Sequence, residues 1–326
     1  MNLSAIFVFT IVFLLSNLSL SAQSYKDSTK NNQYVRLNIE NDALIWRQRT
    51  DRYFTSGIRL DYLRCVNKNK PSRFKDIIPK LQNGETYLGV SFASNMYTPK
   101  NRFTEAIVLG DRPYAGWAYI AYTGISNSKS KATRLKIEYS LGALGPSTEQ
   151  EKIQTTIHKW LNRPLSKGWK NQILNDLAAN VFFNVEKRVI SRTEYLDILG
   201  IVEANIGTVT NYMGLGGLVR LGLFEDYFDN VMPLKTSKDW QVFIFIRPTV
   251  RVMTDNSLLQ GGVFNYRKSP YVIPRDDLKH VYLENAFGYS LTYRSFNITG
   301  IQNFRTPEFK DAQNMFWGTV AFSYGF

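Results

Sequence analysis

Hydrophobic and polar positions alternate along most of the chain after residue 33. In one clear example, Leu135 and Ile137 alternate with Arg134 and Lys136. A period of two is the pattern of a β-strand with one apolar and one polar face. It predicts twelve strands, over 33–43, 52–66, 84–94, 114–127, 131–143, 177–190, 195–207, 211–223, 239–253, 281–293, 295–306 and 315–326.

The final strand indicates where the apolar faces point. Phe316, Phe322, Tyr324 and Phe326 share one face, and that much aromatic surface on a soluble edge strand would favour aggregation. In a membrane barrel the apolar face meets lipid and the polar face lines the lumen. We therefore expect an all-β fold, a single twelve-stranded antiparallel transmembrane β-barrel over residues 23–326. A strand of alternating aromatics ending in Phe also looks like the signal read by the barrel assembly machinery.

The N-terminus is the one continuously apolar segment. Ala5–Leu15 is too short to span a bilayer as a helix, which needs about 20 residues. The apolar run and the small residues after it fit a signal peptide over residues 1–22. We therefore expect export to the outer membrane of a Gram-negative cell.

The longest loop, 144–176, contains the helical pattern. Ser147 stands three residues before Gln150, a capping-box spacing. Apolar residues then recur at helical spacing until Pro164. A second short helix is predicted over 169–176. We thus expect short helices in one extracellular loop, with 224–238 among the periplasmic connections.

The amino-acid composition excludes several classes of partner and of site. The 40 Lys and Arg exceed the 27 Asp and Glu, giving a net charge of +13. So basic a soluble protein would suggest nucleic acid as the partner, but export and the barrel pattern argue against it. One Cys excludes an internal disulfide framework, and two His leave little room for a His-rich metal site. The chain also lacks a G-x-S-x-G nucleophile motif.

Polar residues from distant segments converge on the extracellular rim. Alternating strand directions bring Asn41-Asp42, Thr55, Asp111-Arg112 and the helix bearing His158 to that end. By parity Asp42 and Thr55 face the lumen, whereas Asn41 has the lipid-facing parity. A loop helix folded over the lumen mouth would bring His158 to Asp42 and Thr55.

These residue types suit one kind of chemistry. A His can act as general base toward water near neutral pH. Carboxylate and amide oxygens suit calcium, which can stabilise an ester oxyanion. Simpler roles stay open: packing for His158, a turn for Asn41-Asp42 and a structural ion pair for Arg112.

At these residues the sequence resembles the lipid A deacylase family, LpxR, of outer-membrane enzymes. The likeness runs through nearly the whole mature chain and depends on the order and spacing of its motifs. The matching segments are Glu40–Asp42, Thr50–Gly57, Gly110–Trp117, Leu144–Ser147, Gln154-x-x-x-His158, Gly168–Gln172 and Arg305–Phe309.

The resemblance implies a calcium-dependent barrel enzyme that removes 3′-linked acyloxyacyl chains from lipid A. His158 would activate water, while Asn41, Asp42 and Thr55 would organise the cation and the oxyanion region. Some members have a functional Glu shortly after the His, where Asn162-Arg163-Pro164 stand here. We expect an acidic residue elsewhere to complete the metal ligands, with Glu151 the choice and Glu149, Asp51 and Asp111 as alternatives. A weaker dependence on calcium is the other alternative.

Basic residues in or beside the extracellular loops suit a phosphorylated lipid. We expect lipid A, or lipopolysaccharide, to be bound by Arg52, Arg112, Lys159 and Lys167. We expect outer-membrane lipids, and no nucleic acid, as partners. We also expect the protein to be a monomer. Two alternatives stay open: a phospholipase-type esterase, and a non-catalytic pore or lipopolysaccharide-binding barrel.

Overall fold

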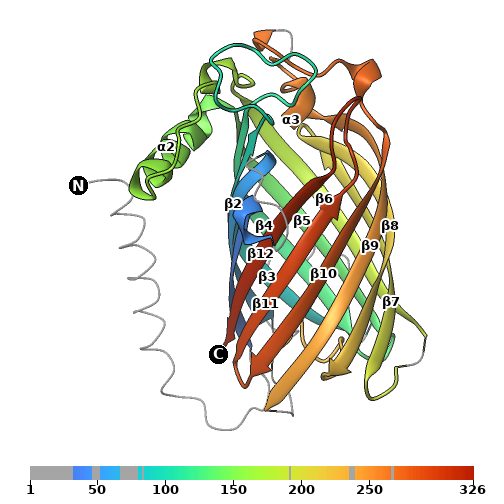
Figure 1. Ribbon diagram of the computed structural model, residues 1–326. Coiled ribbons are helices and arrows are strands. Elements are labelled where there is room, and N and C mark those ends of the chain that lie inside the picture. Colours follow the sequence, from blue (N-terminus) through green and yellow to red (C-terminus); the bar gives the residue numbers. More distant parts are fainter. Residues whose placement is uncertain are drawn as a thin grey trace.

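The computed structural model describes residues 32–45, 52–66, 80–82, 84–190, 192–234, 239–265 and 268–326. Twelve antiparallel strands form a closed barrel in which each strand pairs with its neighbours in sequence and β1 also pairs with β12 (Figure 1). The strands are β1 (Gln33–Asn41), β2 (Tyr53–Val66), β3 (Glu85–Thr98), β4 (Ala115–Ser128), β5 (Thr133–Leu144), β6 (Asp176–Ile190), β7 (Leu196–Gly207), β8 (Thr210–Leu223), β9 (Trp240–Asn256), β10 (Val281–Tyr293), β11 (Phe296–Arg305) and β12 (Met315–Gly325). The predicted strand order and fold class are confirmed. The expected signal peptide, 1–22, lies outside the described residues.

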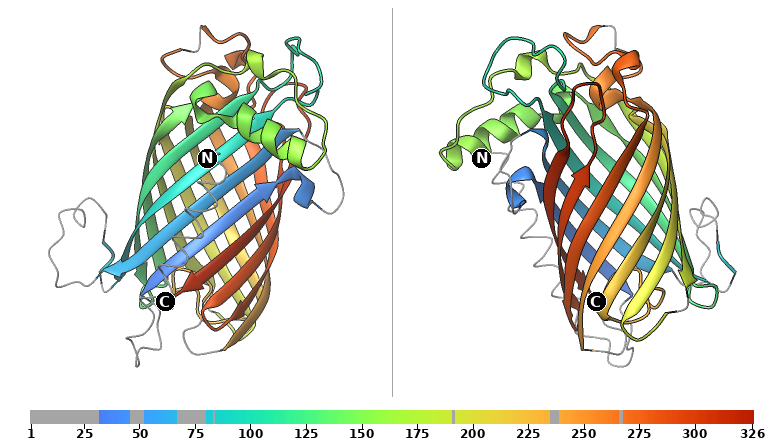
Figure 2. Two further views of the ribbon diagram at one scale, coloured as in Figure 1. Left: turned by 90° about the vertical axis from the view of Figure 1, so that its left-hand side faces the viewer. Right: turned by 45° about the vertical axis from the view of Figure 1, so that its right-hand side comes forward.

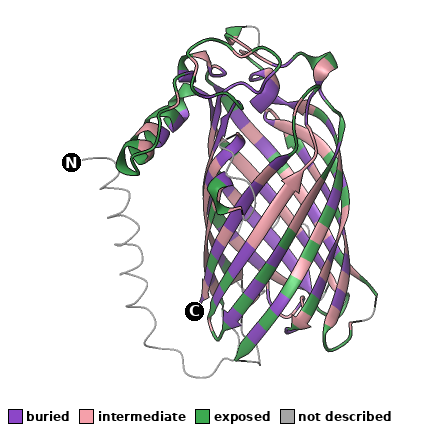
Figure 3. Ribbon diagram, in the orientation of Figure 1, coloured by how far each residue is buried: buried purple, intermediate pink, exposed green. Residues whose placement is uncertain are grey.

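The two faces of the wall have the expected polarity. Outward-pointing Ile120, Met213 and Leu215 are each about two-thirds exposed, whereas inward-pointing Glu138 and Glu203 are buried. Buried and exposed bands therefore alternate along the strands (Figure 3). Near the end that carries the barrel's termini, aromatic pairs line the outside, as in the girdles of membrane barrels. They are Trp240 with Tyr293 and Phe296 with Tyr324.

Charged side chains inside the barrel bind one another. Arg59 meets Glu138 at 2.7 Å, Arg251 meets Glu203 at 2.6 Å and Arg220 meets Asp197 at 2.6 Å. These pairs join different strands on the inner face of the barrel, with Arg220 and Asp197 on the neighbouring strands β8 and β7. They satisfy charges that burial would otherwise penalise.

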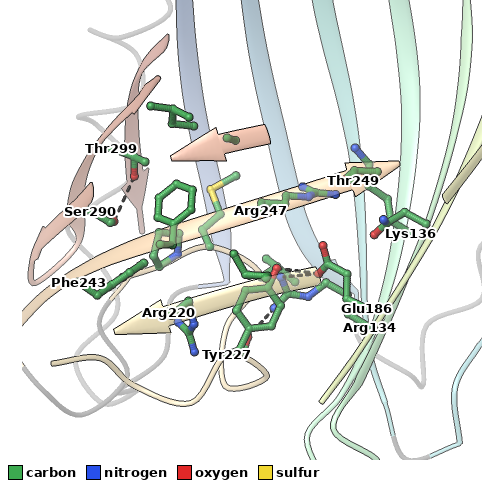
Figure 4. A pocket seen from close by; sticks show the side chains of 18 of the residues that line it. Arg134, Lys136, Glu186, Arg220, Tyr227, Phe243, Arg247, Thr249, Ser290 and Thr299 are labelled. Atoms are coloured by element: carbon green, nitrogen blue, oxygen red, sulfur yellow. Dashed lines mark hydrogen bonds and ion pairs between the residues drawn. The ribbon is translucent and has the colours of Figure 1, made fainter. Parts of the chain in front are cut away.

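Residues 224–234, between β8 and β9, fold into the periplasmic end of the lumen. Arg134 on β5 donates to the carbonyl oxygens of Tyr227 and Asn230, and Asn127 on β4 donates to that of Phe228. We call residues 224–234 the periplasmic plug. Tyr227 and Arg134 line a cavity of about 510 Å³ above it, together with Arg220 and Glu186 (Figure 4). The sequence predicts 224–238 only as a periplasmic connection, and its insertion into the lumen was not predicted.

The extracellular end is covered as well. A buried apolar cluster there includes Leu258 of α3 (Ser257–Gln260) and Phe309 of the β11–β12 loop. Leu278, which follows the 3-10 turn η7 (Arg275–Asp277), forms a bridge with Phe309. Helix α3 adds a second helical loop to the single one that was predicted.

The 145–175 segment differs in detail from its prediction. A 3-10 turn, η4 (Pro146–Thr148), is followed by left-handed Glu149, and helix α2 runs over Gln150–Trp160. Ser147 therefore does not cap the helix. The second predicted helix is only the 3-10 turn η5 (Trp169–Asn171). Among the described residues, no helix is long and apolar enough to cross a membrane.

Candidate functional site

Helix α2 packs against the outside of the barrel wall. Gln150 Nε2 donates to Ser94 Oγ on β3 at 2.7 Å. On β4, a Cβ added at Gly116 would collide with Thr148 and Gln150, so glycine allows this close approach. Ser94 and Gly116 have the outward parity of exposed Phe92 and Ile120. The expectation that the helix folds over the lumen mouth is therefore wrong, and Figures 1 and 2 show it beside the barrel.

Trp169 anchors the loop to this outer surface. Its ring is 1% exposed and lies with Met96 of β3 and with Tyr114, whose ring centroid is 4.8 Å away. Burial raises the pKa of Tyr114 to about 12, so its hydroxyl stays protonated and donates to the Arg102 carbonyl. Trp169 Nε1 also donates to Gln154 Oε1 at 2.7 Å. The tryptophan thus ties helix α2 to the wall.

A polar stripe of α2 turns toward the wall. Gln150, Gln154 and His158 recur every four residues, which places them on one helix face. Gln150 and Gln154 are buried, and His158 is half-buried. Within the described part of the chain, Gln154 Nε2 is buried without a hydrogen-bond acceptor. One turn before the histidine, the site therefore offers an N–H donor.

The ring of His158 is held in a defined tautomer. Nδ1 lies 2.7 Å from the carbonyl oxygen of Pro164, and because a carbonyl only accepts, Nδ1 must carry the proton. The lone pair is then on Nε2. Buried Arg102 donates to the same carbonyl at 3.1 Å and thereby holds it in place. This geometry suits a general base.

Asn41 and Asp42 lie where β1 ends early. Asn41 caps the 3-10 turn η2 (Asp42–Leu44), its Oδ1 accepting from Ala43 N at 2.7 Å. The turn packs on the outer side of β12, because a Cβ at Gly318 would collide with Leu44. Asp42 is 1% exposed. The pair therefore sits at the outer side of the wall rather than over the lumen.

Thr55 is displaced by a β-bulge. The β2–β3 register shifts between Phe54 and Ser56, so Thr55 is an extra residue. Its hydroxyl is 2.8 Å from that of Thr98, which shares the outward parity of Met96. The predicted lumen-facing position is thus wrong, because strict alternation does not continue through a bulge.

His158, the Asn41-Asp42 pair and Thr55 all lie on the outer side of the wall, but they do not all contact one another. Helix α2 and the end of β1 lie on the same side of the barrel, and the C-terminal end of α2 stands away from the wall (Figures 1 and 2). The hydrogen bond of His158 goes to Pro164. Within the described ranges, no hydrogen bond joins the ring to Asn41, Asp42 or Thr55.

Acidic groups near α2 are dispersed. Glu151 is exposed on the helix, and Glu149 pairs with Lys152 at 2.7 Å. Buried Asp111 accepts from the backbone N–H groups of Lys100 and Arg112. Asp51 lies outside the described residues. The structure, as far as it describes the chain, holds no cluster of three or more His, Cys, Asp or Glu able to bind a metal.

The predicted phosphate-binding cations occupy different environments. Lys159 and Lys167 are exposed beside the helix. Arg52 hydrogen-bonds to Gln313. Arg112 is 1% exposed, stacks on Tyr97 and lies 3.2 Å from Glu308. Of the four, the two lysines are the most accessible to a lipid headgroup.

Two residues of the site had been given no role. Gln154 was identified in the Gln154-x-x-x-His158 motif, but only as part of the resemblance. Arg102 had no comparable signal, because it reaches Pro164 across 62 residues of sequence. Only the folded loop brings that pair together.

Comparisons with known proteins agree with the barrel. The model of a family described as outer membrane protein LpxR matches residues 7–326. The solved structure of LpxR from Salmonella typhimurium aligns with a TM-score of 0.73 and 18% identity, covering 90% of this chain and 100% of that one. The β domain of the Bordetella autotransporter BrkA aligns with a TM-score of 0.45 and 8% identity, covering 91% and 99%. No curated protein sequence matches.

Proposed function

Because this chain belongs to the LpxR family of outer membrane proteins, we propose that it hydrolyses the 3′-linked acyloxyacyl ester of lipid A in the outer membrane. The observation that carries the proposal is the hydrogen bond from His158 Nδ1 to Pro164. It leaves Nε2 free as a base on the wall-facing side of a helix. An ester at this place would be approached from the membrane and not through the lumen.

The chain's own residues can supply the proton transfers. Water donates a proton to His158 Nε2 as its oxygen attacks the ester carbonyl carbon. The Gln154 amide can donate a hydrogen bond to the oxyanion that forms. The imidazolium then returns the proton to the departing alkoxide. The products are a carboxylic acid and a lipid A hydroxyl, and no covalent enzyme intermediate is needed.

Calcium is part of the proposal, with Asp42 and Asn41 as its protein ligands. A buried carboxylate next to an amide oxygen is a suitable beginning for a calcium site, which takes six to eight oxygens in general. Glu151 fits less well because it is exposed two turns before His158. When bound, the ion would polarise the ester carbonyl. Thr55 lies at the same rim and would help to order this region.

Two lysine side chains are the main groups that we propose to bind the lipid phosphates. Lys159 follows His158 directly, and Lys167 follows Pro164 by three residues. Both are exposed, so a lipid phosphate can reach them. A pore is less well supported, because the periplasmic plug and the extracellular cluster fill the two ends of the lumen.

Mass spectrometry of lipid A tests the function. Cells would express the wild type, His158→Ala or His280→Ala, with outer-membrane preparations assayed in calcium or a chelator. His280 is a matched control because its Nδ1 also meets a backbone carbonyl, that of Met253 at 2.8 Å. We expect loss of an acyloxyacyl mass with the wild type and His280→Ala, and intact lipid A with His158→Ala.

The chelator separates the two parts of the proposal. Activity that persists without calcium would contradict the metal role and leave His158 as the base. Unchanged lipid A in every sample, with folded barrel present, would overturn the deacylase function. Release of fatty acid from phospholipid instead would favour the phospholipase-type esterase.

A further inference from the structure

Helix α2 exposes apolar side chains instead of burying them. Ile153, Ile157 and Leu161 are 41%, 43% and 55% exposed, and Trp160 is 83% exposed. These positions lie within a narrow arc of the helix, at 100° per residue. The part of the chain that the structure describes therefore leaves an apolar stripe of four residues exposed.

The other faces of the helix are of different character. Gln150 and Gln154, which turn to the wall at the start of the helix, lie within or beside the arc of the apolar stripe, whereas Glu151, Lys152 and Lys159 are exposed on the side away from it. An apolar face beside a charged face, with Trp included, is the composition of helices that lie in a membrane interface. Core packing does not explain this arrangement.

The apolar stripe continues a surface that already faces lipid. Helix α2 begins against Ser94 on the outside of β3. On β3 and β4 that outer surface presents Val90, 52% exposed, and Ile120, 65% exposed. Figure 1 shows α2 beside the wall near the extracellular end of the barrel, which in an outer-membrane barrel is the end on the side of the outer leaflet. Acyl chains that contact the wall are the nearest apolar material to the helix.

We propose that α2 is an interfacial helix whose face formed by Ile153, Ile157, Trp160 and Leu161 is inserted among the acyl chains of the outer leaflet. Trp160 lies at the level of the headgroups, where indole rings are favoured, and Lys152 and Lys159 point to water. This interaction does not depend on any hydrolytic activity. It gives the helix a second support besides its contacts with the wall.

Site-directed spin labelling tests the insertion without an activity assay. A Cys65→Ser background removes the native thiol, and a nitroxide is then attached at Ile157→Cys. Lys159→Cys is the matched control on the charged face of the same helix, and Ile120→Cys is the lipid-facing standard on the wall. Each protein is reconstituted in phosphatidylcholine–phosphatidylglycerol vesicles. The readout is collision with oxygen, which enriches in lipid, relative to a water-soluble nickel chelate.

We expect the oxygen-to-nickel ratio at residue 157 to approach that at residue 120 and to exceed clearly that at residue 159. Equal, nickel-dominated ratios at 157 and 159 would overturn the proposal, since the helix would then stand in water. Low collision with both reagents at 157 would also overturn it, because protein and not lipid would cover the face. Transfer of the labelled proteins to detergent without phospholipid should change the ratio at 157 and 120 together.

Discussion

The lumen and the outer side of the wall under α2 use polar residues in opposite ways. Inside, Asp197 is fully buried and binds both Arg188 and Arg220. Outside, as far as the structure describes the chain, His158 hydrogen-bonds to one backbone carbonyl through Nδ1 and Gln154 Nε2 is buried without an acceptor. The lumen has the more prominent charges, and its carboxylates Glu138, Asp197 and Glu203 pair with arginines. Even there, among the described residues, Arg36 Nε and Asn184 Nδ2 are buried without a hydrogen-bond partner. A polar side chain can take part in a reaction where it is held in place and still has a hydrogen-bonding atom without a partner.

This contrast separates stability from activity. Charges matched across strands should mainly hold the barrel closed, because breaking a buried pair leaves an uncompensated charge. Groups around His158 should mainly affect turnover, because they hold the loop that carries His158 and do not join the strands of the barrel to one another. Variants in each region therefore test this distinction.

The largest effect on stability is expected from Asp197→Ala. It leaves the cations of Arg188 and Arg220 facing each other with one carboxylate fewer, and we expect it to reduce stability by about 3 kcal/mol. The measurement is the temperature at which the compact barrel band is lost in denaturing electrophoresis. Deacylation by the protein that remains folded should be unchanged.

An exposed ion pair is the control for that variant. Glu105 meets Lys170 at 2.9 Å, and the hydrogen bond and charge of the lysine lower the pKa of the Glu105 carboxyl. Glu105→Gln should leave the midpoint temperature unchanged, since solvent screens such pairs. A midpoint for Asp197→Ala equal to that for Glu105→Gln would contradict the structural role of the lumenal charges.

The barrel itself could be predicted because its pattern is local. Each strand carries its own alternation of apolar and polar residues, and strand count and direction then follow from closure. The periplasmic plug had no such signal. Its binding to the lumen rests on carbonyl oxygens of Tyr227 and Asn230, and backbone acceptors are the same in every sequence.

The site was predictable in its residues but not in its geometry. The order of the motifs singled out His158 and the rim groups, whereas parity placed Thr55 inside the barrel. One extra residue at the bulge reverses that assignment. The position of α2 likewise depends on the contact of Gln150 with Ser94 and on the missing Cβ of Gly116. Such contacts between distant segments have no period along the chain.

A smaller effect, on turnover, is expected from Arg102→Met. The arginine holds the Pro164 carbonyl that orients His158, so it is a positioning residue. A hydrogen bond from a charged donor contributes about 1.5 kcal/mol, so kcat should fall about tenfold with KM little changed. Steady-state deacylation of purified lipid A in detergent provides both constants.

The conservative variant Arg102→Lys tests whether a lost orientation of His158 causes the fall in kcat. Arg102→Lys keeps a cationic donor and should restore part of the lost kcat. Equal losses in Arg102→Met and Arg102→Lys, together with a lower midpoint temperature, would indicate a loop-packing role instead.

The smallest effect is a pH dependence of the periplasmic plug. Burial would raise the pKa of Asp226, but hydrogen bonds from Arg188 and from the Phe228 backbone outweigh it and lower that pKa. A carboxyl with a lowered folded-state pKa stabilises the fold above its unfolded pKa of about 3.9 and loses that contribution as the pH falls through the folded value. The wild type should therefore have a higher midpoint temperature than Asp226→Asn near neutral pH, and the difference should shrink below about pH 4. A difference that stayed constant into acid would show that Arg188 and Asp226 hold the plug by shape and not by charge.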